Sequence, residues 1–193
     1  MKETTRKCLA DEFRYLRSFT KDIFTSFEER IIVAQGEVIS TNMVVNYLKE
    51  IGIKALLIDA LDFMRTDKNA EPDAHYIKEH LSEIMSANKG YQIYITQGFI
   101  CRNAYGEVDN LQRGGSDYTA SLIGAALMAD EIIIWTDIDG MHNNDPRIVD
   151  KTEAVHQLHF EEAAELAYFG AKILHPTCVQ PAKFTGIPVR IKN

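Results

Sequence analysis

The sequence lacks any apolar run of the ~20 residues that a membrane-spanning helix needs, and residues 1–6 lack the apolar core of a signal peptide. It is also poor in cysteine, with only Cys8, Cys101 and Cys178 and no C-x-x-C spacing. An odd number of cysteines without that spacing predicts neither a disulfide framework nor a zinc site. We therefore predict a cytoplasmic protein with reduced thiols, no membrane partner and no metal-ligating side chains.

A broad basic surface is missing as well. Lysine and arginine total 21 against 28 aspartates and glutamates, which gives a formal net charge of −7. Nucleic-acid-binding domains usually carry a basic face, so this balance argues against a nucleic-acid partner. The 193 residues, 46% of them hydrophobic, suffice for a single domain with a buried core. An anionic ligand would need a local cluster of positive charge.

Hydrophobic periodicity predicts alternating helices and strands. Helices are expected over residues 1–26, 28–51, 74–88, 120–129, 160–170 and 179–184. Strands are expected over residues 53–60, 91–100, 131–135 and 188–191, with a hairpin over 101–110. This alternation predicts an α/β sandwich with a mainly parallel sheet, in which ligands gather at the carboxyl ends of the strands.

The second predicted helix, 28–51, is so rich in apolar residues that we expect it to be largely buried. Glu37 interrupts this apolar sequence, next to Gly36. Either Glu37 lies on the solvated side of the helix, or it points into a site.

The segment 111–119 places Arg113, two glycines and a Ser-Asp pair where an apolar helix begins. Ser116 is the expected N-cap of that helix. Free backbone N–H groups and the helix dipole favour an anion there, and Arg113 can hold a carboxylate with two parallel hydrogen bonds. The alternative is a glycine turn with a capping serine and a solvated arginine.

Seven motifs occur together and in a fixed order from about Glu28 to the end of the chain. They are Gln35-Gly36-Glu37, Met64-Arg65-Thr66, Ile95-Thr96-Gln97-Gly98-Phe99, Arg113-Gly114-Gly115-Ser116-Asp117-Tyr118-Thr119, Trp135-Thr136-Asp137, Asp145-Pro146-Arg147 and Phe169-Gly170-Ala171-Lys172-Ile173-Leu174-His175-Pro176. Through this ordered series the chain resembles the aspartokinases, members of the amino acid kinase family.

The resemblance implies a three-layer αβα sandwich and an ATP-dependent phosphorylation of the side-chain carboxylate of L-aspartate. The product, 4-phospho-L-aspartate, enters lysine, threonine and methionine biosynthesis. The attacking carboxylate, with an ordinary pKa near ~3.9, is already ionised at neutral pH and needs no general base. The site must instead align the reactants and neutralise charge.

On the substrate side, the family pattern makes Arg113 the clamp for the substrate carboxylates and Glu37 the partner of its ammonium group. Gly98 and Phe99 would line the amino-acid pocket. Ser116 and Asp117 would organise the substrate and the reacting groups, with Asp117 orienting cationic or metal-linked partners rather than taking a proton.

On the nucleotide side, the resemblance implies that Thr136 and Asp137 contact ATP near its adenosine end. Arg147 would reach the phosphates, and Lys172 would neutralise charge there. Mg²⁺ is expected to be held mainly through phosphate oxygens. The residues expected to act in catalysis are therefore Asp117, Lys172 and Arg113.

The chain departs from the family pattern in several places. No Lys-Phe-Gly-Gly-Thr-Ser motif precedes Glu28, and no regulatory ACT domain follows the last strand. We therefore expect residues 1–193 to form a partial catalytic domain, weakly active or inactive alone. Asn110 and Gln112 replace a common threonine and glycine, and His142 stands where the family often has a tyrosine near the nucleotide.

Two alternatives remain open from the residues alone. The chain could belong to another amino acid kinase, such as a glutamate kinase, or to a non-catalytic binding or regulatory module that keeps the fold. The helical surface from Phe13 to Phe27, if uncovered, is a candidate interface for a homo-oligomer.

Overall fold

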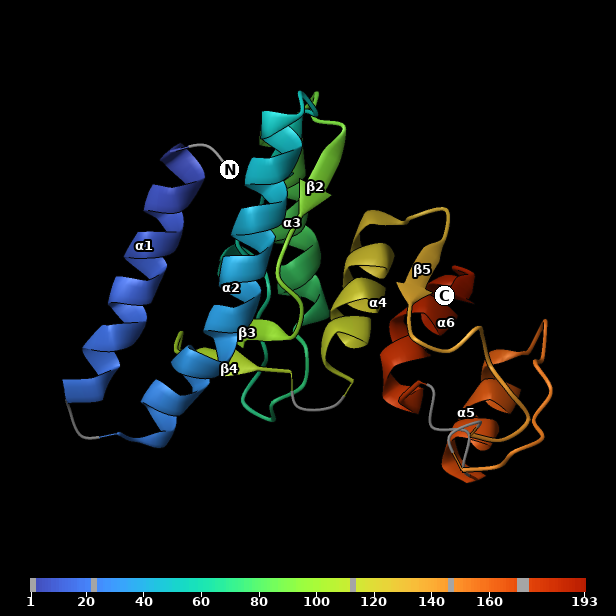
Figure 1. Ribbon diagram of the computed structural model, residues 1–193. Helices are drawn as coiled ribbons and strands as arrows, with labels where there is room; N and C mark the ends of the chain where they lie inside the picture. The colour runs from blue at the N-terminus through green and yellow to red at the C-terminus, as the bar shows by residue number, and fades with distance from the viewer. Residues whose placement is uncertain (1–2, 22–23, 112–113, 146–147, 170–173) are drawn as a thin grey trace. The chain divides into compact units, whose positions relative to one another are not determined.

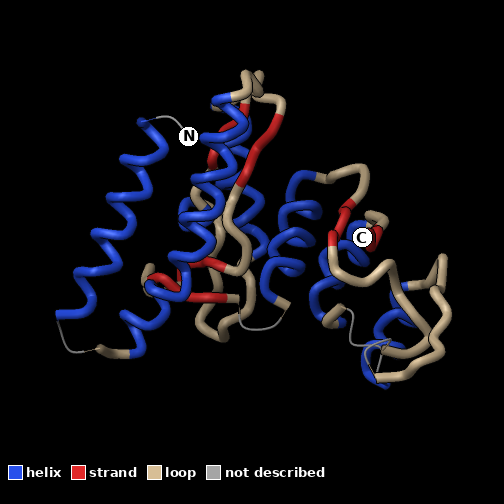
Figure 2. Tube along the Cα trace, viewed as in Figure 1, coloured by secondary structure: helices blue, strands red, loops and turns tan. Residues whose placement is uncertain are grey.

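The computed structural model describes residues 3–21, 24–111, 114–145, 148–169 and 174–193. The chain divides into two compact units, residues Met1–Asn110 and Leu111–Asn193, and each is described by itself. Figure 1 labels the helices and strands of both units, and Figure 2 distinguishes helices, strands and loops by colour.

Two helices lie side by side at the start of the first unit, α1 (Glu3–Ser18) and α2 (Ser26–Glu50), with the 3-10 turn η1 (Phe19–Lys21) after α1 (Figure 1). The Thr5 hydroxyl donates a 2.9 Å hydrogen bond to the Glu50 carboxylate, which joins the start of α1 to the end of α2. Helix α2 begins at a capping box, in which Thr25 and Glu28 bond each other's backbone N–H groups.

The parallel pair of the first unit consists of β1 (Ala55–Leu57) and β2 (Ile93–Ile95), with Ala55 opposite Ile93. The crossover between them contains the 3-10 turn η2 (Ala60–Asp62) and α3 (Ala74–Ala87), which Asp73 caps by accepting from the Tyr76 N–H. The core beneath these elements contains Phe63, Met64, Ile77 and Leu81. An antiparallel hairpin of β3 (Ile100–Arg102) and β4 (Val108–Asn110) ends the unit.

The second unit begins with α4 (Gly115–Leu127) and has one parallel strand pair, β5 (Ile132–Trp135) with β6 (Val189–Lys192). Between these strands lie α5 (Phe160–Phe169), the 3-10 turn η3 (Pro176–Val179) and α6 (Gln180–Thr185). Ile132, Ile134, Ala182 and Ile187 form a buried cluster that α4, α6 and the two strands enclose.

Every predicted helix and strand has a counterpart in the described part of the chain. Three bounds differ by five residues or more: the first helix ends at Ser18 instead of residue 26, β2 ends at Ile95 instead of residue 100, and α4 begins at Gly115 instead of residue 120. The predicted burial of α2 is wrong. Only Ala34, Gln35, Thr41 and Val45 are buried in it, whereas Val44 and Tyr47 are among several exposed apolar side chains. Apolar residues occur around the whole circumference of this 25-residue helix, but its neighbours in the unit cover only part of it.

No helix among the described residues is both long and apolar enough to cross a membrane. The prediction of a single partial catalytic domain over residues 1–193 stays a prediction.

Two helical glycines differ in what surrounds them. A Cβ on Gly124 of α4 would lie 2.5 Å from Ile132 Cγ1 and 2.6 Å from Ile132 Cδ1, because α4 packs closely on β5. A Cβ on Gly36 of α2 would meet no atom within 4 Å. Packing against Ile132 therefore requires a glycine at position 124, whereas packing does not require one at position 36.

We expect Gly124→Ala to lower the free energy of unfolding by about 1–3 kcal/mol, because the added methyl group overpacks the α4–β5 contact. The matched variant Gly36→Ala should raise it by up to about 1 kcal/mol, since alanine favours a helix. Urea unfolding followed by circular dichroism measures both changes. Effects of the same sign and size in the two variants would contradict this account.

Candidate functional site

Glu37 lies on α2 and is half-buried. Its backbone carbonyl accepts hydrogen bonds from the Thr41 hydroxyl at 2.7 Å and the Ser40 hydroxyl at 3.1 Å. Within the described residues, no hydrogen bond or ion pair involves its carboxylate. A half-buried carboxylate without a partner is suited to receive a cationic group from a ligand.

Gln97 connects Glu37's turn of α2 to the carboxyl end of β2. Its side chain is 2% exposed, and its Oε1 accepts the Ala60 N–H at 2.8 Å. Its Nε2 donates at 3.3 Å to the Thr41 hydroxyl, which itself donates to the Glu37 carbonyl. One buried amide therefore links η2, α2 and the loop after β2. Gln97 is not among the predicted site residues, although its position directly after a strand is a signal for such a role.

The two predicted pocket residues Gly98 and Phe99 follow Gln97 immediately and are half-buried. Phe99 has φ +49°, a left-handed backbone that a non-glycine residue seldom adopts. The Ile100 N–H bonds the Gly98 carbonyl at 2.7 Å across this turn. Such conformations cost about 1–3 kcal/mol and are common at binding sites. The first unit thus brings Glu37 and the Gly98–Phe99 loop together through Gln97.

Gly114 and Cys178 are in close contact in the second unit. Gly114 has φ +78°, and a Cβ there would lie 1.6 Å from the Cys178 Sγ, so no other residue fits without a shift. Cys178 is fully buried in η3, where burial and the charge of Asp117 raise the pKa of its thiol to about 11. The thiol is therefore neutral near pH 7 and acts as a packing group.

The predicted N-cap at Ser116 is wrong. Helix α4 begins at Gly115, with Gly114 as the N-cap and no side-chain capping bond, because the left-handed turn at Gly114 starts the helix two residues early. Ser116 is consequently an exposed residue of the first helical turn. Asp117 lies next to it, half-buried, and burial raises the pKa of its carboxyl group. Arg113 lies outside the described residues.

Thr136 and Asp137 lie directly after β5. The Thr136 N–H bonds the Lys192 carbonyl at 2.8 Å, which extends the β5–β6 ladder, and its hydroxyl donates to the exposed Asp137 carboxylate at 3.1 Å. Both polar side chains thus lie at the carboxyl end of a parallel strand, where ligands of α/β proteins commonly bind. This agrees with the position expected for them, while their contact with a nucleotide stays a prediction.

His142 is buried, with 8% exposure, and both of its ring nitrogens are engaged. Nε2 is 2.6 Å from Asp139 Oδ1, and Nδ1 is 3.0 Å from the Thr152 hydroxyl. The hydrogen bond with His142 lowers the pKa of Asp139. Both ring nitrogens of His142 are therefore engaged within the protein. The predicted nucleotide contacts of Arg147 and Lys172 lie outside the described residues.

A cavity of about 840 Å³ lies in the second unit, within the size range of small-molecule sites. Asp139, the partner of His142, lines it together with His175, Phe160, Arg190 and Lys192. Among the described residues, no group of three or more His, Cys, Asp or Glu side chains could hold a metal ion.

A model of the amino acid kinase family matches residues 3–193. The lysine-sensitive aspartokinase 3 of Escherichia coli is 42% identical over 163 residues, which cover 82% of this chain and 36% of the relative. The chloroplastic aspartokinase 1 of Arabidopsis thaliana is 41% identical over 170 residues, covering 84% of this chain and 30% of the relative. The chain therefore spans about a third of the length of these curated relatives.

Among solved structures, E. coli aspartokinase III in complex with aspartate and ADP matches 98% of this chain and 44% of its own, with a TM-score of 0.89 and 32% identity. These findings confirm the family resemblance predicted from the seven motifs. They also confirm a mixed α/β fold of the amino acid kinase type with parallel strands.

We expect Gly114→Ala to lower the free energy of unfolding by more than about 2 kcal/mol, because the methyl group meets both a left-handed backbone and the Cys178 thiol. The control Gly106→Ala has a similar φ of +83° but nothing within 4 Å, so it should cost only about 1–2 kcal/mol.

Adding Cys178→Ala to Gly114→Ala removes Sγ and leaves the Cys178 Cβ 3.3 Å from the new methyl group. The double variant should therefore lose less stability than the sum of the two single variants. Urea unfolding of the four proteins measures this difference. Strict additivity would show that the thiol does not restrict position 114.

Asp117 should make the protein less stable at neutral pH than a neutral isostere would. Its folded pKa is raised by burial, so the folded state binds a proton at higher pH than the unfolded state, and stability increases as the pH falls through that pKa. We expect Asp117→Asn to raise the melting temperature at pH 7, with the difference shrinking toward pH 4.

Asp73→Asn is the control of opposite sign. The hydrogen bond from Arg65 lowers the pKa of Asp73 in the folded state. The ionised carboxylate therefore stabilises the fold at pH values above its ordinary pKa, and this stabilisation is lost as the pH falls through the lowered pKa of the folded state. This variant should lower the melting temperature at pH 7, and the loss should fade as the pH falls below about 4. Thermal melts across this pH range test both signs; a destabilising Asp117→Asn at pH 7 would contradict the role of burial.

Proposed function

Because the chain belongs to the amino acid kinase family, we propose that the protein transfers the γ-phosphoryl group of ATP to the side-chain carboxylate of L-aspartate. The observation that carries the proposal is the Gln97 contact, which holds the turn of α2 bearing Glu37 next to the Gly98–Phe99 loop. An acid beside an aromatic side chain suits an amino acid as ligand. The Glu37 carboxylate would bind its ammonium group, and the Phe99 ring would contact its carbon chain. Similarity to aspartokinases supports aspartate as that amino acid.

In the proposed reaction, an oxygen of the ionised substrate carboxylate bonds to the γ-phosphorus as the bond to the β–γ bridging oxygen breaks and ADP leaves. No proton has to be removed from the nucleophile, so the site needs alignment and compensating charge rather than a base. Glu37 would bind the ammonium group and Arg113 the carboxylates. Ser116 and Asp117, in the first turn of α4, would orient the reacting groups.

The nucleotide would be bound by the second unit. Thr136 and Asp137 at the end of β5 suit contacts near the adenosine, and the ring of His142 would contact the base. Arg147 and Lys172 would supply positive charge to the phosphates. Mg²⁺, bound through phosphate oxygens, would neutralise the charge that develops on the transferred group.

The proposed product is 4-phospho-L-aspartate, at the start of lysine, threonine and methionine biosynthesis, and we place the reaction in the cytoplasm. A homo-oligomer also belongs to this proposal. Phe13, Phe24 and Phe27 are 54%, 57% and 39% exposed, and they remain its candidate interface.

Trapping the acyl phosphate with hydroxylamine tests the activity. In the full-length protein that contains this chain, we expect hydroxamate to form with aspartate and ATP·Mg²⁺, and much less with glutamate. Glu37→Gln should raise the KM for aspartate at least about tenfold and leave the KM for ATP unchanged, since it removes the charge that binds the ammonium group.

The control is Glu29→Gln, an exposed acid in the first turn of the same helix. It should leave both KM values unchanged. A protein that prefers glutamate would contradict aspartate as the substrate. Binding of neither aspartate nor ATP in a calorimeter would instead favour a non-catalytic module.

A further inference from the structure

The hairpin of β3 and β4 joins two segments of the proposed amino-acid site. Phe99 directly precedes β3, and Arg113 follows β4 by three residues. Ile100 pairs with Asn110 at the open end of the hairpin, so Phe99 adjoins the end at which the two strands are paired. Any movement of the hairpin would therefore move Phe99.

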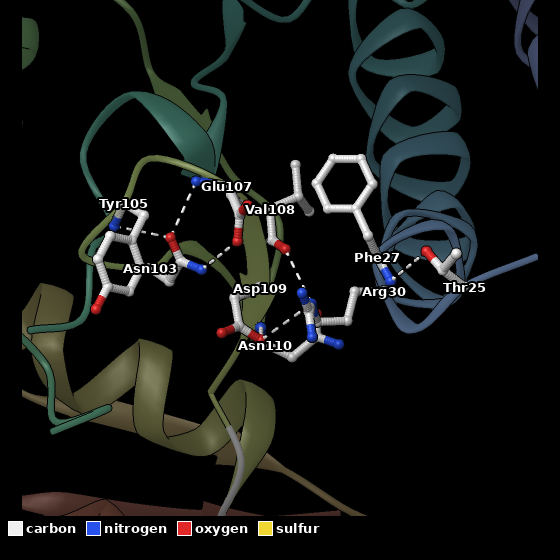
Figure 3. Close-up of polar contacts among 9 residues, drawn as sticks. All are labelled: Thr25, Phe27, Arg30, Asn103, Tyr105, Glu107, Val108, Asp109 and Asn110. Atoms are coloured by element: carbon white, nitrogen blue, oxygen red, sulfur yellow. Dashed lines mark hydrogen bonds and ion pairs between the residues drawn. The ribbon is translucent and has the colours of Figure 1, made fainter. Parts of the chain in front are cut away.

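Hydrogen bonds inside the hairpin make it stiff (Figure 3). The Asn103 Oδ1 accepts the N–H groups of Tyr105 at 2.9 Å and Glu107 at 3.0 Å, and its Nδ2 donates to the Glu107 carboxylate at 2.9 Å. Arg102 Nη1 closes the loop by donating to the Gly106 carbonyl at 2.8 Å. With its turn cross-linked in this way, the hairpin should move as one piece.

Backbone hydrogen bonds attach β3 to the segment before α3, from the Arg102 N–H to the Met64 carbonyl at 2.9 Å and from the Thr66 N–H to the Arg102 carbonyl at 2.8 Å. Two arginine side chains add further contacts. Arg102 of β3 donates from Nε to the Leu61 carbonyl at 3.0 Å. Arg30 of α2 donates from Nε to the Val108 carbonyl at 3.3 Å and lies 3.7 Å from Asp109 Oδ1 (Figure 3). The Arg30 and Asp109 side chains are 32% and 26% exposed, so water weakens their attraction less than on an open surface.

Arg30 also shares a face of α2 with Glu37. They are seven positions apart, which is close to two helical turns, so their side chains leave the helix in nearly the same direction. The same face of α2 therefore holds β4 at one level and presents Glu37 two turns further on. The spacing between Glu37 and Phe99 therefore depends on two contacts: that of Gln97 with Thr41 on the strand side of Phe99, and that of Arg30 with the hairpin on its other side.

We propose that Arg30 is a positioning residue for the amino-acid substrate: by binding Val108 and Asp109 it fixes the hairpin, and with it Phe99, relative to Glu37. This role rests on the proposed function, because it assumes that Glu37 and Phe99 bind the substrate. This role predicts an effect on substrate affinity rather than on the chemical step, since Arg30 would act through its contacts with Val108 and Asp109.

The test compares Arg30→Ala, Arg30→Lys and the control Arg14→Ala in the full-length protein. Arg14 is an exposed helical arginine whose ion pair, with Asp11 at 3.0 Å, lies within α1. We expect Arg30→Ala to raise the KM for aspartate about three- to tenfold, with kcat and the KM for ATP unchanged. Arg30→Lys keeps the charge opposite Asp109 and should recover most of the affinity, while Arg14→Ala should match the unmodified protein.

Hydrogen exchange of the amides of residues 100–110 gives a second, independent measurement. Arg30→Ala should speed exchange there and leave α3 unchanged. Unaltered exchange, or faster exchange with an unaltered KM for aspartate, would overturn the proposal. So would a parallel loss of kcat and of affinity for both substrates, which would point to a purely structural role. Absence of aspartate binding by the unmodified protein would overturn the proposed function, and the exchange data would then show whether Arg30 still holds the hairpin.

Discussion

The first unit depends on one buried amide. Gln97 has almost no contact with solvent, so its two polar atoms would cost about 1–3 kcal/mol each if they lacked partners. Both have partners, and these come from different elements: the Ala60 backbone at η2 and the Thr41 hydroxyl on α2. Shifting any of the three elements breaks a buried hydrogen bond. The loop after β2 is thereby fixed to the helix that carries Glu37.

A steric constraint has the same effect in the second unit. The Cys178 thiol occupies the space that a side chain on Gly114 would need, and it places η3 directly against the start of α4. This contact sets where α4 begins and therefore where Ser116 and Asp117 lie. It also buries part of Asp117, whose pKa rises as a result. Backbone geometry and electrostatics at this site thus have a common origin in one close approach.

Local patterns in the sequence were sufficient for the elements but not for their contacts. Periodicity located α2, α3 and the β3–β4 hairpin, because each depends on neighbours within a few positions. It failed for the burial of α2 and for the N-cap of α4, since the packing of other segments decides both. Arg30 and Val108 are 78 positions apart, and nothing in either neighbourhood indicates their hydrogen bond. Gln97 was visible in a motif, yet its role follows only from its two distant partners.

The two acids of the proposed substrate site are held away from full solvation, Glu37 by half-burial on α2 and Asp117 by burial at the start of α4. A partly desolvated carboxylate gains more from a nearby cation than an exposed one does. In a chain of net charge −7, the proposed cations are the side chain of Arg113, the ammonium group of the substrate and a metal ion on ATP. Folding therefore leaves the Asp117 carboxylate in a higher-energy state that a correctly placed cation would relieve. In the proposed reaction, this would help a site without a general base to favour a charged, aligned reactant pair.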